Sequence, residues 1–309
     1  MLKETVKYFI SPLLKKYDIL NNQIEENRIL TARILINEMR KSEYTPENIS
    51  DFEFKVFSQR GEDGIIQYLI SRVAIYNPVF VEFGVEDYTE SNTRFLMVNN
   101  NWQGLIMDSD EGNIKKIKKR DIFWQYDITA VNAFITKENI NKLIESNGIN
   151  GDIGLLSIDI DGNDYWIWEA INIISPRIVI CEYNSVFGYK EAVTVPYSER
   201  FNRTEKHYSN LYFGASLKAL CILAQKKGYI FVGSNSAGSN AFFVREDTAQ
   251  NLKPVDCEKG YVESKFRESR DKSGNLTFLS GKNRINQIGD LYLFDVITKQ
   301  GKRISELDI

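Results

Sequence analysis

Acidic residues close several short apolar runs in this sequence, and their positions indicate a binding site. Glu82 and Gly84 end the run that begins at Val79, Asp108 closes the next run, and Asp127 closes the third. Ligands of open α/β sheets bind outside the carboxyl ends of the strands, so acids at successive strand ends would surround one crevice. Gly84 would allow a ligand close to the backbone. Asp108 could accept both hydroxyls of a ribose, and Asp127 could hold the amino group of an adenine.

Small polar residues follow the first of these runs and open the next helix: Ser91, Asn92 and Thr93. The free N–H groups and the dipole at a helix N-terminus attract anions. We therefore expect these three residues to hold a carboxylate group of the ligand.

The segment SQRGEDG, residues 58–64, precedes another expected helix. Ser58 could be the N-cap of that helix, with Glu62 and Asp63 favouring its dipole. Alternatively, Gln59 and Glu62 line the ligand pocket. The sequence leaves both interpretations open.

A second acidic group follows the fourth and fifth runs. Asp159 and Asp161 face the same side if the strand continues that far, and Glu182 and Asn184 end the neighbouring strand. Hard oxygen ligands of this type suit Mg²⁺, Mn²⁺ or Ca²⁺, and such an ion would lower the pKa of a bound hydroxyl. Alternatively, residues 161–164 form a turn that leads into a helix N-cap.

His207 is the only histidine, so mechanisms that need two histidines are excluded. Near neutral pH it could act as a general base together with Asp159 and Asp161, although a histidine in a polar loop is also often simply exposed. Aromatic residues around it could stack on a sugar, or equally serve packing: Tyr183, Tyr189, Tyr197, Phe201 and Tyr208.

Short apolar runs alternate with helix-like stretches from Phe54 onward, which predicts a doubly wound α/β sheet. We expect strands at Val79–Phe83, Gly104–Asp108, Ile122–Tyr126, Gly154–Asp159, Arg177–Glu182, Tyr229–Gly233 and Ala241–Arg245. Only a short polar linker separates the last two, so they should form an antiparallel hairpin. We expect helices at Glu62–Ile75, Ser91–Asn99, Glu111–Lys119, Lys137–Ser146, Asp164–Ile173 and Ala215–Lys227, the last followed by Gly228 as its C′ residue.

The N-terminal segment predicts one long helix from Ser11 to Arg40, with Ser11 and Pro12 as N-cap and first residue. It carries a heptad-like seam of residues 13, 17, 20, 24, 27, 31 and 34, with Asn27 at one core position. The seam favours either packing on the chain's own domain or a homodimer. We expect three parts: a helical arm at 1–50, a core at 51–247 with a substrate insertion at 185–214, and a C-terminal extension at 248–309.

Composition limits the class of protein further. The chain has 309 residues, a formal net charge of −3 and 43% hydrophobic residues, which is typical of a globular protein without a nucleic-acid partner. Its three cysteines are widely spaced and match neither a zinc motif nor a disulfide framework. The N-terminus resembles no signal peptide and no stretch could span a bilayer, so we expect a soluble, cytoplasmic protein.

Four segments resemble the FkbM-type branch of class I S-adenosylmethionine-dependent methyltransferases. They are residues 58–64, 81–93 (VEFGVEDYTESNT), 102–110 (WQGLIMDSD) and 155–168 (LLSIDIDGNDYWIW), and the similarity covers roughly residues 55–247. The resemblance implies a Rossmann-like seven-stranded fold and O-methylation, often of sugars in natural products or surface polysaccharides. It also implies that Glu82, Gly84, Asp108 and Asp127 contact the cofactor.

One departure from the family pattern keeps other functions open. Glu86 and Asp87 stand where the glycine-rich loop of the family has small residues, and carboxylates there would disfavour the carboxylate of S-adenosylmethionine. A binding protein that kept the fold without catalysis is therefore one alternative. An NAD-dependent oxidoreductase is another, but G-x-G-x-x-G is absent and the expected hairpin is atypical of that class.

Overall fold

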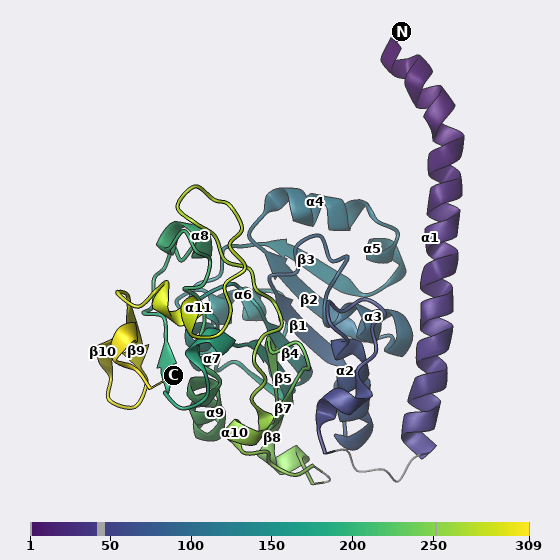
Figure 1. Ribbon diagram of the computed structural model, residues 1–309. Helices are drawn as coiled ribbons and strands as arrows, with labels where there is room; N and C mark the ends of the chain where they lie inside the picture. The colour runs from purple at the N-terminus through teal and green to yellow at the C-terminus, as the bar shows by residue number, and fades with distance from the viewer. Residues whose placement is uncertain (1, 42–46, 251, 309) are drawn as a thin grey trace.

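The computed structural model describes residues 2–41, 47–250 and 252–308, and a seven-stranded sheet forms its centre (Figure 1). The strand order is β3-β2-β1-β4-β5-β8-β7. Neighbouring strands from β3 to β5 run parallel, whereas β8 is antiparallel to both β5 and β7. This is the Rossmann-like methyltransferase sheet that the sequence predicts, including the terminal hairpin. The strands are β1 Val79–Phe83, β2 Gln103–Asp108, β3 Ile128–Asn132, β4 Gly151–Ile158, β5 Ile174–Glu182, β7 Tyr229–Ser234 and β8 Asn240–Arg245.

Helices cover both faces of the sheet, because successive strand side chains point to opposite faces and both sets are apolar. Val81 and Leu156 face α6, α7 and α9, whereas Phe80 and Ile106 face α2, α3 and α4. The helices are α2 Glu62–Arg72, α3 Arg94–Asn100, α4 Glu111–Lys119, α5 Ile122–Gln125, α6 Ile140–Ser146, α7 Asp164–Ala170, α8 Arg203–Lys206, α9 Leu217–Lys226, α10 Cys257–Gly260 and α11 Lys282–Asn286. Short 3-10 turns are η1 Ile49–Phe52, η2 Ser185–Phe187, η3 Glu246–Thr248 and η4 Ile304–Glu306. Gly228 follows α9 with a φ of 81°, as its predicted C′ role requires.

The third strand differs from the prediction. Residues Ile122–Gln125 form the short helix α5, and β3 begins only at Ile128. A short apolar run cannot by itself distinguish a strand from a helix. Asp127 therefore precedes β3, where its backbone carbonyl accepts the N–H of Gly104 at the start of β2. The residue that closes β3 beside Asp108 is Asn132.

A second, three-stranded sheet joins the C-terminal extension to the insertion. β9 Tyr292–Asp295 lies between β10 Gln300–Arg303 and β6 Val193–Thr194, and both pairings are antiparallel. Apolar side chains from both segments form one small core: Val193, Val195, Leu211, Ile288, Leu293 and Ile304. The later part of the segment after β8 thereby lies near α8, where Gln287 after α11 bonds Tyr208 at 2.6 Å, whereas α10 packs against β7 and α9 (Figure 1).

The N-terminal helix α1 runs from Leu2 to Lys41, so the predicted start at Ser11 is wrong. Pro12 lies inside the helix, and the side chain of Ser11 is outside the described residues. A proline removes one hydrogen bond but leaves good helix formers on both sides to continue the helix. Part of α1 extends past the rest of the molecule (Figure 1). In the part of the chain that the structure describes, no helix combines the length and the apolarity that a membrane span requires.

The face of α1 that packs on the core is not the predicted seam. Ala32, Ile36 and Met39 are buried, and Glu25 pairs with Arg94 of α3. The apolar seam residues are exposed instead: Leu13 by 69%, Tyr17 by 62%, Leu20 by 57%, Ile24 by 42% and Ile34 by 63%. Because α1 packs on its own domain through another face, the seam is exposed to solvent. The homodimer stays a prediction.

Charges on the exposed seam test this prediction. If α1 mediates a dimer, Leu20→Asp combined with Ile24→Asp should halve the mass measured by light scattering, because two carboxylates would enter the helix interface. Neither side chain packs on the core, so the melting temperature of each subunit should stay close to that of the unmodified chain. An unchanged mass would contradict the dimer.

Candidate functional site

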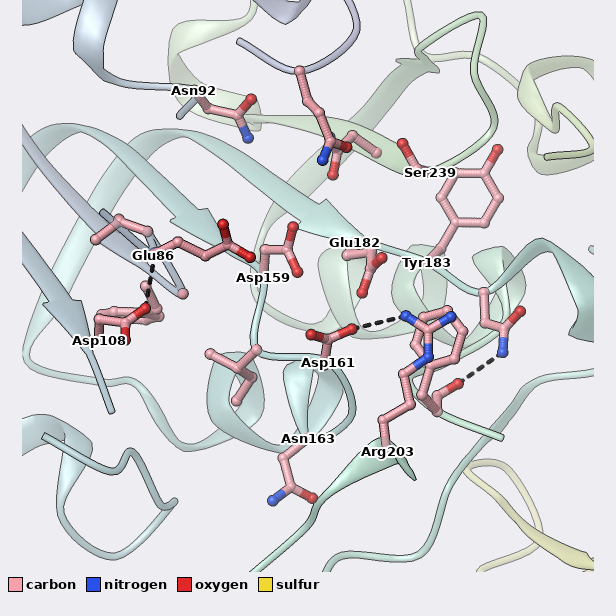
Figure 2. A pocket seen from close by; sticks show the side chains of 18 of the residues that line it. Glu86, Asn92, Asp108, Asp159, Asp161, Asn163, Glu182, Tyr183, Arg203 and Ser239 are labelled. Atoms are coloured by element: carbon pink, nitrogen blue, oxygen red, sulfur yellow. Dashed lines mark hydrogen bonds and ion pairs between the residues drawn. The ribbon is translucent and has the colours of Figure 1, made fainter. Parts of the chain in front are cut away.

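A cavity of about 760 Å³ opens at the carboxyl ends of the parallel strands (Figure 2). It brings together nine of the twelve residues proposed for catalysis or for binding a cofactor or a metal: Gln59, Glu82, Gly84, Ser91, Asn92, Asp108, Asp159, Asp161 and Glu182. Thr93, Asp127 and His207 do not line it. Glu86 and Asp108 lie at one end in the view of Figure 2, Arg203 and Tyr183 lie at the other, and the remaining carboxylates lie between them.

Gly84 is required because the end of β1 lies very close to the chain just after β4. Its φ is +68°, and a Cβ atom added there would lie 1.7 Å from the backbone carbonyl oxygen of Asp159. The end of β1 therefore approaches the chain just after β4 more closely than any side chain would permit. We expected this glycine to admit a ligand, and the structure adds a contact within the protein.

Glu82 already occupies the helix terminus that we expected to bind a ligand carboxylate. Its side chain accepts hydrogen bonds from the hydroxyls of Ser91 (2.7 Å) and Thr93, and from the backbone N–H of Asn92 (2.9 Å). Burial raises its pKa, while these donors oppose the shift. Ser91 and Thr93 thus hold Glu82, and Thr93 occupies the N-cap position of α3 without a side-chain hydrogen bond to the helix. Ser91 and Asn92 line the cavity, so their contact with a ligand carboxylate stays a prediction, whereas Thr93 does not line it.

Asp108 ends β2 with its carboxylate anchored by two backbone N–H groups. Glu86 donates to Oδ2 at 2.8 Å, and Asp110 donates to Oδ1 at 2.8 Å. A carboxylate has about four acceptor positions, so one on Oδ2 stays available. The side-chain amide of Asn113 also reaches Oδ1, at 3.5 Å. A ligand hydroxyl could displace this long contact, so the carboxylate suits a pair of neighbouring hydroxyls.

Asp127 lies at the amino ends of the strands, opposite the cavity, and the prediction that it contacts the ligand is wrong. Its carboxylate accepts a hydrogen bond from Gln103 at 2.7 Å and lies on the exposed surface. The error follows from the wrong position of the third strand.

Glu86 and Asp87 have different surroundings. Glu86 lines the cavity with a φ of 47°, whereas Asp87 does not line it and accepts the backbone N–H of Thr89. Only one of the two unusual carboxylates therefore faces the site.

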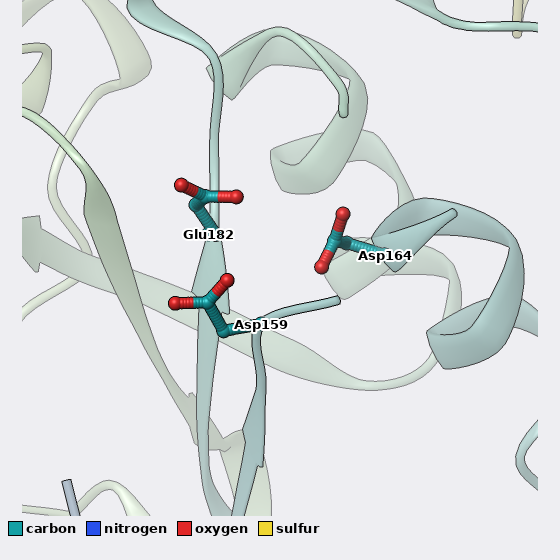
Figure 3. A group of neighbouring side chains, drawn as sticks. All are labelled: Asp159, Asp164 and Glu182. Carbon is teal, nitrogen blue, oxygen red and sulfur yellow. The ribbon is translucent and has the colours of Figure 1, made fainter. Parts of the chain in front are cut away.

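Three carboxylates form a cluster beside the centre of the cavity: Asp159, Asp164 and Glu182 (Figure 3). One oxygen from each lies within 4.8 Å of the others. Among the described residues, no hydrogen-bond donor reaches the side chains of Asp159 or Glu182, and Oε2 of Glu182 is buried without a partner. Burial and the neighbouring carboxylates raise the pKa of both well above ordinary values.

Asp161 is not in this cluster, which corrects the predicted ligand set. With a φ of 55° it turns away and bonds Arg203 at 2.9 Å. Asp164 replaces it, but its two oxygens accept the N–H groups of Ile160 (2.9 Å) and Gly162 (2.9 Å). The predicted turn is therefore present, with Asn163 as the N-cap of α7.

His207 lies outside the cavity, and its assignment as general base is corrected. Nδ1 is 2.7 Å from the hydroxyl of Ser209, and the ring lies 4.2 Å from that of Tyr208. Burial lowers its pKa. These contacts hold the His207 ring within the loop that follows α8.

Gln59 and Arg60 line the cavity, whereas Ser58, Glu62 and Asp63 of SQRGEDG serve the structure. Oδ2 of Asp63 accepts three backbone N–H groups, those of Val56, Phe57 and Ser58, at 2.7–2.8 Å. Glu62 accepts amide donors from Asn235 (2.7 Å) and Asn240 (3.1 Å), which ties α2 to the β7–β8 hairpin. Gly61, and not Ser58, is the N-cap of α2.

Comparisons with known proteins found only remote structural similarity. No protein-family model matches the sequence, and no curated protein matches it. The N-terminal domain of EvdMO1 with S-adenosyl-homocysteine bound has a TM-score of 0.40 and 11% identity, covering 69% of this chain and 94% of that one. A S-adenosylmethionine-dependent methyltransferase from Clostridium acetobutylicum has a TM-score of 0.39 and 8% identity, covering 59% and 89%. TrmK from M. capricolum, in complex with S-adenosyl-homocysteine, has 0.35 and 11%, covering 68% and 75%. Similarity this low carries no argument about activity, so the proposals below rest on the site itself.

Sequence reasoning missed the residues that close the far end of the cavity. Phe213 lies under Arg203, 3.7 Å from its guanidinium carbon, and Phe266 lies under Arg60 at 3.8 Å. Of the five aromatic residues proposed for sugar stacking, only Tyr183 and Phe201 line the cavity. Phe266 comes from the C-terminal extension, whose weak periodicity offered no signal of this role.

Proposed function

We propose that this chain is an S-adenosylmethionine-dependent O-methyltransferase that acts on a saccharide hydroxyl. One observation carries the proposal: Gly84, Asp108 and Asp159 line a single cavity at the carboxyl ends of the parallel strands. Open α/β sheets bind their ligands at that edge, and Asp108 retains acceptor positions for the hydroxyls of a ribose. Membership of the FkbM-type branch and the sugar acceptor rest on the sequence resemblance.

The unpartnered carboxylates suit the proton transfer that O-methylation requires. S-adenosylmethionine supplies, when bound, a methyl carbon that exchanges its bond to a positively charged sulfur for a bond to the acceptor oxygen. The chain must align that hydroxyl and remove its proton. We propose that Asp159 removes this proton. Its carboxylate faces the cavity without a partner, and its raised pKa makes it a stronger base. Asp161 holds Arg203 in place and is a positioning residue.

A divalent cation is the alternative use of the same carboxylates. Asp159, Glu182 and Asp164 offer hard oxygen ligands. Asp164, however, holds the turn before α7 through one backbone N–H on each oxygen, which leaves it fewer acceptor positions for an ion than Asp159 or Glu182 have. We therefore propose a proton acceptor and not a metal centre.

Cofactor binding tests the proposal directly. Calorimetry should detect binding of S-adenosylmethionine and S-adenosylhomocysteine but not of NAD. Asp108→Asn should weaken that binding about tenfold or more, because it replaces a charged acceptor of two ribose hydroxyls. Asp127→Asn is the matched control. It makes the same chemical change at the amino ends of the strands, away from the cavity, and should leave the affinity unchanged.

Two outcomes would contradict the proposal. Binding of NAD in preference to S-adenosylmethionine would favour the oxidoreductase. Failure to bind any adenosyl compound would favour a binding protein without catalysis, which the carboxylate of Glu86 inside the cavity also favours.

A further inference from the structure

Arg284 of α11 lines the same cavity, and none of the described carboxylates forms an ion pair with it. Its side chain is only 8% exposed, and its Nε is buried without a partner. Within the described ranges, no carboxylate or carbonyl group forms an ion pair or hydrogen bond with this guanidinium. Taking an unpaired cation out of water costs much free energy, and burial accordingly lowers its pKa. An anion that enters the cavity would therefore stabilise this group.

The surroundings of Arg284 also favour an anion. Among the charges around it, Glu263 acts most strongly and favours the charged guanidinium, but Glu263 is exposed and lies outside the cavity lining, whereas the positive charge of Arg203 acts in the opposite sense. Arg203 also lines the cavity, and it already bonds Asp161 at 2.9 Å and the carbonyl of Asn210 at 2.8 Å. Glu268 also lines the cavity, but its carboxylate is paired with Arg270 at 3.3 Å and accepts a hydrogen bond from Asn210 at 3.2 Å. This end of the cavity is therefore less negative than the carboxylate cluster at its centre.

Neighbouring groups indicate what else the ligand carries. The Oδ1 atom of Asn210 is buried without a donor, so it can accept a hydroxyl. Phe201, Phe213 and Phe266 offer apolar surface on the same cavity. A cation, a free acceptor and aromatic faces together suit a molecule with an acidic group, hydroxyls and an apolar face.

We propose that Arg284, with Arg203 beside it, binds the negatively charged group of a saccharide acceptor, either a carboxylate or a phosphate ester. This inference rests on the proposed function and adds the acceptor class to it. The C-terminal extension then determines acceptor specificity, because it supplies both Arg284 and Phe266. The cofactor end, at Gly84 and Asp108, lies on other elements.

Direct binding of simple probes tests the proposal. D-glucuronate and glucose 1-phosphate represent the two sources of charge, and D-glucose is their neutral counterpart. The unmodified chain should bind at least one charged probe about tenfold more tightly than D-glucose, and the preferred probe identifies the group. Arg284→Gln should abolish that preference, whereas Arg284→Lys should retain part of it. Lys282→Gln removes one positive charge from an exposed position of the same helix and should change nothing.

Measurements of stability and cofactor affinity distinguish failure of the anion site from failure of the proposed function. Arg284→Gln should raise the melting temperature, because it removes a buried unpaired charge, and should leave S-adenosylmethionine affinity unchanged. Equal affinity for charged and neutral probes in the unmodified chain would overturn this inference, even if the cofactor binds. Charge-selective binding without any S-adenosylmethionine binding would overturn the proposed function and leave the anion site standing.

Discussion

Asp159→Asn should reduce turnover about two to four orders of magnitude and at the same time raise the melting temperature. The amide cannot accept a proton from the acceptor hydroxyl. It also removes a carboxylate whose ionised form is disfavoured by burial and by the charges of Asp161 and Asp164. A purely structural role would move both readouts in the same direction. S-adenosylmethionine affinity should stay within about threefold of its original value, because the substitution preserves size.

The pH dependence of the unmodified chain gives an independent measure of the same group. Only ionised Asp159 is a base, so turnover should rise with pH through an apparent pKa above that of an ordinary aspartate. Stability should change in the opposite sense: a carboxyl group whose pKa is raised by folding stabilises the protein while protonated, and this contribution is lost as pH rises through the folded-state pKa. Asp159→Asn should weaken both trends.

Two results would contradict the assignment of Asp159. One is near-normal turnover of the asparagine variant. The other is complete loss of turnover after EDTA treatment with recovery on adding Mg²⁺, which would favour a metal centre at the same carboxylates.

Gly84→Ala should lower the free energy of unfolding by about 2–5 kcal/mol. A left-handed conformation costs an alanine about 1–2 kcal/mol, and forcing a methyl group into packed surroundings costs about 1–3 kcal/mol more. The methyl group would lie 1.7 Å from the carbonyl oxygen of Asp159, which is a backbone atom and cannot rotate away. Urea unfolding monitored by circular dichroism measures the change.

Gly148→Ala is the matched control for this variant. Gly148 has a similar φ of +77°, but an added Cβ would meet nothing within 4 Å. The control should therefore show only the conformational cost. Equal destabilisation by both substitutions would mean that the contact between β1 and the chain after β4 contributes nothing.

Those parts of the fold that follow from buried apolar runs could be predicted from the sequence. The strand Val79–Phe83 matches its prediction because five adjacent residues suit a two-sided interior. Asp108 and Asp159 followed directly, since each stands where such a run ends. The third strand could not be placed in this way, because the apolar run 122–126 suits either structure, whereas the true strand Ile128–Asn132 includes exposed Thr129 and Asn132.

The end of the cavity that we propose binds the acceptor could not be predicted, for a different reason. Arg284 and Phe266 come from a segment whose position depends on the pairing of β9 with β6, about one hundred residues earlier in the chain. No local periodicity encodes a pairing over that separation. His207 shows the converse: its chemistry suited catalysis, but the tight turn after α8 directs it to Ser209.

The late position of β9 also determines the order in which the site is completed during synthesis. All five parallel strands, with Gly84, Asp108 and the carboxylate cluster, have been made by Glu182. The strand that pairs with β6 and holds the extension over the cavity leaves the ribosome more than one hundred residues later. A nascent chain can therefore assemble the part of its cavity around Gly84 and Asp108 first, and the part that Arg284 and Phe266 line is completed only when its final segment has been made.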